Sequence, residues 1–173
     1  QKLLASSQLI YGSLDSVQVI DADAQKGAFM SPLLLLNETP FQSKEVHEIE
    51  AFGPVSTLMP YDHVEDAIQL AKMGKGSLVS SIVTADKSIA KSYVLGAGMY
   101  HGRILVLNSD CAKESTGHGS PLPLLVHGGP GRAGGGEEMG GIRGVKHYMQ
   151  RVAIQGSPDM ITAISNIYQP GAK

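Results

Sequence analysis

The pattern of apolar and polar positions is clearest in the segment DHVEDAIQLAKMGKG, residues 62–76. Apolar side chains recur there at the i, i+3, i+4 and i+7 positions of one buried helix face. These side chains are Val64, Ala67, Ile68 and Ala71. Asp62 and Glu65 are three residues apart, as in an N-terminal capping box, and Gly74 supplies a stop. The segment is therefore predicted to be a helix.

A second helix is predicted for DKSIAKSYVLGAG, residues 86–98, which begins at Asp86. Strand-type residues fill the segments around the two helices, namely FGPVSTLMPY (52–61), SLVSSIVT (77–84) and RILVLN (103–108). The middle one of these strands is expected to be mostly buried. The order β-α-β-α-β with short links predicts an α/β fold, in which a mostly parallel sheet is covered by helices.

Patterns nearer the N-terminus are weaker. LLASSQLI (3–10) indicates the end of a helix, and DSVQVID (15–21) alternates like a short strand. AFMSPLLLLN (28–37) is apolar but contains Pro32, which predicts an edge strand or a strand entered through a bend. Residues 38–47 are polar and are expected to form a loop.

After Asn108, glycine, proline and serine replace the periodic pattern. Eleven of the chain's 21 glycines lie between Gly117 and Gly144. A loop of this length inside a compact domain is usually functional or disordered. Beyond it, IRGVKHYMQ is predicted to be a helix and RVAIQ (151–155) a strand, and residues 156–173 are expected to form a loose amphipathic tail.

The composition suits one domain with a substantial core, because 42% of the 173 residues are hydrophobic and 17% are charged. A net charge of −2 argues against a dedicated nucleic-acid binder. No apolar run is long enough to cross a bilayer, and the N-terminus has neither a signal-peptide pattern nor an initiator methionine. We therefore expect a cytoplasmic piece of a longer protein.

The single cysteine, Cys111, excludes an intrachain disulfide and a zinc site built from several cysteines. His118 and His127 are close to it in sequence, so a cysteine–histidine nucleophile is one hypothesis. The adjacent carboxylate of Asp110 disfavours the thiolate, and an incidental thiol is the favoured interpretation. The six histidines show no metal-ligand spacing, so no metal site is expected.

The glycine-rich loop contains a formal G-x-G-x-x-G pattern from Gly129 to Gly134. A phosphate-binding loop of that type follows a strand and opens an apolar helix. Here Glu137 and Glu138 occupy the place of the helix start, where two carboxylates would repel a phosphate. A close-packed or mobile surface loop is the favoured interpretation.

The stretch EIEAFGPV contains Glu50 and Phe52, two residues apart, followed by Gly53 and Pro54. One interpretation is an exposed glutamate and a core phenylalanine at the start of a strand. The other is a ligand site, because a carboxylate can accept two hydrogen bonds from a ribose diol and an aromatic ring on the same face can pack beside a planar ring. Gly53 would allow a close approach of the backbone, and Pro54 would fix the direction of the chain.

Glu50-Ala-Phe52-Gly53-Pro54-Val55 resembles the E-x-F-G-P-V motif of the aldehyde dehydrogenase superfamily. GAFMSPLLL before the motif and GRILVLN after it are similar to further strands of that family, and the resemblance covers nearly the whole chain. It implies a partial aldehyde dehydrogenase catalytic domain. In the family, the residue matching Glu50 binds the nicotinamide ribose and the one matching Phe52 borders the nicotinamide ring.

The segment from Ala112 to Pro158 is similar to bifunctional bacterial enzymes of phenylacetate degradation. Those enzymes join an aldehyde dehydrogenase to an enoyl-CoA hydratase that opens an oxepin-CoA ring. The resemblance implies oxidation of a semialdehyde-CoA to the acid with NADP or NAD as acceptor, and it implies a homo-oligomer. It also implies that residues 1–155 belong to the catalytic domain and that residues 156–173 lead towards a hydratase domain.

Several family features have no counterpart in this chain. The family's nucleophilic cysteine lies upstream of the Glu-Phe motif, and residues 1–49 contain no cysteine. Nucleophile and general-base glutamate are therefore expected before Gln1, and the isolated chain is expected to be inactive. The loop from Ser120 to Leu124 lacks the family's Phe-Gly-Gly, which puts the usual aromatic contact to substrate in question. The alternative function is a non-catalytic oligomerisation or domain-interaction module.

Overall fold

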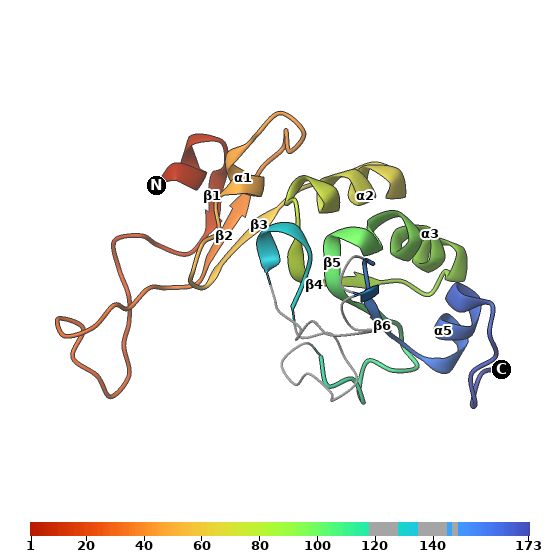
Figure 1. Ribbon diagram of the computed structural model, residues 1–173. Coiled ribbons are helices and arrows are strands. Elements are labelled where there is room, and N and C mark those ends of the chain that lie inside the picture. Colours follow the sequence, from red (N-terminus) through yellow and green to blue (C-terminus); the bar gives the residue numbers. More distant parts are fainter. Residues whose placement is uncertain (118–127, 135–144, 147–148) are drawn as a thin grey trace. The chain divides into compact units, whose positions relative to one another are not determined.

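The fold is described from a computed structural model, which covers residues 1–117, 128–134, 145–146 and 149–173 (Figure 1). The chain separates into two compact units, Gln1–Asp62 and His63–Lys173. Each unit contains its own three-stranded sheet.

The first unit is built on the sheet β1-β2-β3. Its elements are η1 (Lys2–Ala5), β1 (Gln8–Tyr11), β2 (Leu33–Leu36), α1 (Glu45–Glu48) and β3 (Val55–Leu58). β1 is antiparallel to β2, and β2 is parallel to β3, with Leu33 opposite Val55. Leu33 and Leu35 point to the buried face of β2 and are 8% and 2% exposed.

Several predictions for this unit need correction. Residues 3–10 are not the end of a helix, because a 3-10 turn is followed at once by β1. Residues 15–21 form no strand, and Asp21 adopts a left-handed φ of 53° that interrupts extended backbone. β2 is entered just after Pro32, as predicted, but it is the central strand of the sheet and not an edge. The segment 38–47 is a loop only as far as α1.

The second unit has the sheet β4-β5-β6, in which both neighbouring pairs are parallel. Its strands are β4 (Ser77–Val83), β5 (His101–Leu107) and β6 (Ala153–Gln155). Its helices are α2 (Val64–Met73), α3 (Lys87–Ala97), η2 (Gly98–Tyr100), η3 (Gly131–Ala133) and α5 (Pro158–Ser165). Ile104 and Val106 of β5 pack with side chains of α2, α3 and α5 in one core. The predicted α/β fold, a mostly parallel sheet covered by helices, is confirmed.

The predicted β-α-β-α-β run does not form a single sheet. β3 pairs with β2, whereas β4 pairs with β5. β4 is an outer strand of its sheet, and none of its residues is fully buried, with Leu78 52% and Val83 78% exposed. The expectation that this strand is mostly buried was wrong, because an outer strand has a neighbour on one side only and the described residues leave its side chains partly or fully exposed.

The two long helices begin with side-chain caps. In α2 the N-cap is His63, one residue later than predicted, and its N–H donates to the Asp66 carboxylate at 3.1 Å. In α3 the Asp86 carboxylate accepts the N–H groups of Ser88 and Ile89 at 2.7 and 3.1 Å, which confirms the predicted helix start. These hydrogen bonds lower the pKa of Asp86, and the bond from the Ile89 N–H contributes most.

A buried histidine lies at the start of β5. His101 is 4% exposed, and its Nδ1 is 2.5 Å from the hydroxyl oxygen of Ser77, its partner on β4. Its Nε2 is buried and has no hydrogen-bond partner among the described residues. Burial lowers the pKa of His101, so the neutral ring is the stable form in the folded chain.

Residues 156–173 are an ordered part of the second unit. Met160 of α5 is 1% exposed and belongs to the core. After the left-handed cap Asn166, which accepts a hydrogen bond from Lys91 at 3.2 Å, the chain folds back so that the N–H of Lys173 donates to Asp159. A domain boundary after residue 155 stays a prediction. No helix in the described part of the chain is long and apolar enough to cross a membrane.

Candidate functional site

Glu50 and Phe52 lie on an extended strip that leaves α1. The strip begins at Ile49, whose φ of −99° and ψ of 115° end the helix. Ile49 and Ala51 are half-buried, whereas Glu50 is exposed and Phe52 is 95% exposed. Because side chains alternate along extended backbone, this pattern places Glu50 and Phe52 on the same side of the strip.

Two tight turns follow, and they fix how Phe52 is presented. The N–H of Gly53 donates to Ala51 O at 2.9 Å, and the N–H of Val55 donates to Gly53 O at 2.8 Å. These are three-residue γ-turns centred on Phe52 and Pro54, a type that is common at strand ends. Pro54 O then accepts the N–H of Leu33 at 2.9 Å, which joins the turn to β2.

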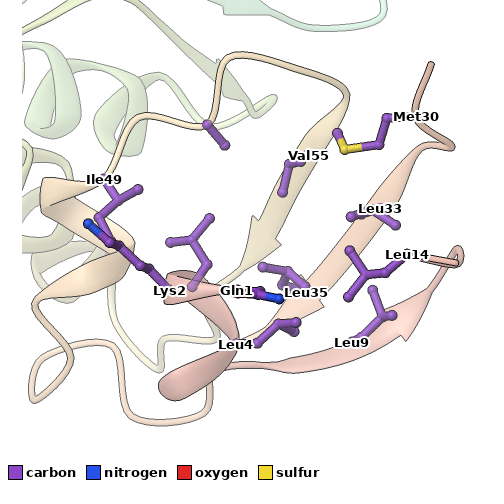
Figure 2. Close-up of a pocket in the computed structure, with 12 residues that line it drawn as sticks. Gln1, Lys2, Leu4, Leu9, Leu14, Met30, Leu33, Leu35, Ile49 and Val55 are labelled. Carbon is purple, nitrogen blue, oxygen red and sulfur yellow. The ribbon is translucent and has the colours of Figure 1, made fainter. Parts of the chain in front are cut away.

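The inward side of the strip borders an apolar cavity of about 310 Å³ (Figure 2). Leu9 from β1, Leu33 and Leu35 from β2, and Val55 from β3 line it together with Ile49. Ile49 and Ala51 thus line the cavity on the inward side of the strip, while Glu50 and Phe52 are exposed. The alternation of polar and apolar residues in EIEAF already indicated which side chains face inward, but the cavity itself was not predicted.

The interpretation of Phe52 as a core residue is wrong for this chain, because its ring is almost fully exposed. A methyl group on Gly53 would meet only the flexible end of Met30, at 3.0 Å, so the chain's own described atoms do not require glycine there. The roles of Glu50 and Phe52 in cofactor binding stay predictions.

Cys111 lies in the loop after β5 and is half-buried. Its thiol is 3.6 Å from Val106 O and 3.9 Å from Asn108 O. It borders a polar depression of about 470 Å³ together with Glu114 and Asp159. His118 and His127, the hypothetical partners, lie outside the described residues. Within the part of the chain that the structure describes, no cluster of His, Cys, Asp and Glu could hold a metal ion.

Residues Gly128–Gly134, which we call the glycine clasp, pack on the turn between α2 and β4. The N–H of Arg132 donates to Lys75 O at 3.1 Å, and that of Gly129 to Gly134 O at 2.9 Å. A Cβ on Gly129 would lie 2.5 Å from Ser77 O. Backbone groups that a phosphate would need are therefore occupied, and the interpretation as a close-packed loop is confirmed for these residues. Glu137 and Glu138 lie outside the described residues.

The sequence of residues 6–154 matches the family model described as "Aldehyde dehydrogenase family". The chain belongs to the aldehyde dehydrogenase family. The match covers both compact units and includes the strip with Glu50 and Phe52.

Individual relatives agree with this assignment. The chain is 57% identical over 147 residues to "Protein MaoC" of Klebsiella aerogenes, a match that covers 85% of the chain and 44% of that protein. It is 36% identical over 129 residues to "3,4-dehydroadipyl-CoA semialdehyde dehydrogenase" of Aromatoleum evansii, covering 75% and 25%. It is 27% identical over 137 residues to "Benzaldehyde dehydrogenase [NAD(+)]" of Pseudomonas putida, covering 77% and 25%. The chain thus spans less than half the length of these relatives.

Proposed function

We propose that this chain forms one wall of the nicotinamide site in an NAD(P)-dependent enzyme that oxidises an aldehyde to the acid. The observation that supports this most directly is the strip after α1. It presents a carboxylate and an aromatic ring, Glu50 and Phe52, to the same open side. In an aldehyde dehydrogenase, such a pair suits a ligand that combines a sugar with a planar ring.

Each residue of the strip has a separate task in this proposal. The Glu50 carboxylate accepts two hydrogen bonds from the vicinal hydroxyls of the ribose. The Phe52 ring packs beside the nicotinamide and excludes water from one side of it. The γ-turns at Phe52 and Pro54 keep both side chains in place. A bound nicotinamide would supply the hydride acceptor, and the thiol nucleophile is expected from residues outside this chain.

The proposed substrate is a semialdehyde that carries a CoA thioester, formed during breakdown of an aromatic compound. The similarity to a relative named for 3,4-dehydroadipyl-CoA semialdehyde supports this class. The resemblance to bifunctional phenylacetate enzymes supports NADP as the acceptor and a hydratase domain in the same protein. We also propose that the longer protein is a homo-oligomer, and that the isolated chain does not turn over aldehydes.

A charge-removing variant in the full-length enzyme tests the role of Glu50. Glu50→Gln should lower kcat/KM for the cofactor by roughly 10- to 150-fold, because a charge-assisted hydrogen bond is lost. Glu38→Gln is the matched control, since Glu38 is an exposed glutamate of the same unit. The melting temperature of both variants should equal that of the unaltered enzyme.

Two results would count against the proposal. Unchanged cofactor kinetics in Glu50→Gln, with a collapse of the melting temperature, would make Glu50 a structural residue. Aldehyde turnover by the isolated chain that disappears in Cys111→Ala would instead restore Cys111 as a nucleophile.

A further inference from the structure

Asn37, at the end of β2, is completely buried. The other large side chains in the described residues that are buried to this extent are apolar, namely Ile104, Val106 and Met160. Burial of a carboxamide is costly unless its donors and acceptor find partners. The partners of Asn37 therefore show what its burial achieves.

The Asn37 side chain joins three segments of the first unit. Its Nδ2 donates to Ser6 O at 2.5 Å, just before β1, and to the Ser43 hydroxyl at 2.9 Å. Its Oδ1 accepts the N–H of Thr39 at 3.0 Å, and the Ser43 hydroxyl in turn donates to Thr39 O at 3.1 Å. We call these four residues the Asn37 network.

The network ends where α1 begins. α1 has a single turn, Glu45–Glu48, with no buried residue and no side-chain cap. A helix this short is not stable by its own hydrogen bonds. Its position is set instead by the preceding turn, to which the ring of His47 is also joined, with Nε2 2.7 Å from Pro40 O.

The strip with Glu50 and Phe52 is thus held at both ends. Pro54 joins its far end to β2 through the hydrogen bond to Leu33. The near end follows α1 directly, so a shift of α1 would move Glu50 along with it. The backbone N–H of Asn37 donates to Leu58 O at 2.9 Å, which fixes the network to the same sheet that holds Pro54.

We propose that Asn37 is a positioning residue, which acts through Ser43 and α1 to place Glu50 and Phe52 for the nicotinamide nucleotide. This inference rests on the proposed function of Glu50. It adds a residue that the family motif does not contain and that lies 13 positions before Glu50 in the sequence.

The first experiment measures amide hydrogen exchange in the 173-residue chain. Ser43→Ala removes the hydrogen bonds that join Ser43, just before α1, to Asn37 and Thr39, but it keeps the sheet. Amide exchange should become about fivefold faster in residues 39–52, because one lost hydrogen bond changes the exchange rate by about this factor. The exchange rates of β2 and β3 should stay unchanged. Asn37→Asp, which loses both donors at constant size, should act in the same direction. Ser56→Ala, at an exposed serine of β3, is the matched control and should change nothing.

The second experiment is a mutant cycle in the full-length enzyme. Ser43→Ala should lower kcat/KM for the cofactor, and this effect should be smaller when Glu50→Gln and Phe52→Ala are both present, because the side chains that the network positions are then missing. Additive losses, or exchange that rises evenly over the whole first unit, would overturn the inference. Failure of the proposed function is recognised separately, when Glu50→Gln alone leaves cofactor kinetics unchanged.

Discussion

Gly102 on β5 has no space for a methyl group. A Cβ there would overlap the carbonyl oxygen of Gly128 in the glycine clasp and would lie 2.9 Å from Leu78 O. Gly74, at the end of α2, is the opposite case, because a Cβ would meet no atom of the described part of the chain within 4 Å and its φ is −67°. The same glycine-to-alanine change should therefore lower the free energy of unfolding at Gly102 and raise it at Gly74.

Gly102→Ala should lower the free energy of unfolding by about 1–3 kcal/mol, the usual cost of overpacking. Gly74→Ala should raise it by about 0.4–1 kcal/mol, because alanine restricts the unfolded chain. Urea denaturation followed by circular dichroism measures both. Equal stability of the two variants would show that the clasp does not pack on β5.

At the scale of elements, the sequence was sufficient where a local pattern specifies the structure. The apolar spacing predicted α2 and α3, and Asp86 marked a true helix start. The start of α2 was misplaced because Asp62–Glu65 and His63–Asp66 both offer polar side chains three residues apart. The division into two sheets was not predictable, because the residue pattern of a strand does not show which other strand it pairs with. Asn37 was missed because a polar residue at the end of a strand looks exposed until its partners are known.

The pairing of β4 with β5 gives a pH dependence that can be measured. Because burial lowers the pKa of His101 in the folded state, the unfolded chain binds the proton first. Stability should therefore fall as the pH drops below about 6.5, the ordinary value for histidine. His101→Asn should weaken this dependence. Asp86 does not interfere, because the hydrogen bonds from Ile89 and Ser88 lower the pKa of its carboxyl, which stays ionised over this pH range.

Denaturation curves at pH 5.5 and 7.5 provide the comparison. The difference in unfolding free energy between the two pH values should be smaller in His101→Asn than in the unaltered chain. If His101→Asn and the unaltered chain lose the same stability on acidification, a group other than His101 causes the pH dependence.

At the scale of the whole molecule, the last residues are part of the core and not an appendage. Met160 packs with Ile104 and Val106, and residues 166–173 fold back onto the start of α5. An apolar side chain that is 1% exposed contributes several kcal/mol when buried, as large-to-small substitutions show. The resemblance suggested a linker here, but the sequence could not show that its apolar residues pack on α3.

Deletion of residues 157–173 should therefore unfold the second unit, with loss of its cooperative thermal transition by circular dichroism. Met160→Ala should lower its stability by about 2–5 kcal/mol, and Tyr168→Ala, at a side chain 69% exposed, should have little effect. Light scattering on the intact chain tests the proposed homo-oligomer at the same time. A deletion variant that melts like the intact chain would restore these residues as a free tail.

The exposure of Phe52 has a practical use in spectroscopy. The chain contains no tryptophan, so Phe52→Trp would create a single fluorophore at the tip of the strip. A ring that is 95% exposed is surrounded by water, and its emission should be that of a solvated indole. Any nucleotide, domain or subunit that covers this side would move the emission to shorter wavelength. The position that carries the proposed contact is thus also the place where its formation can be seen.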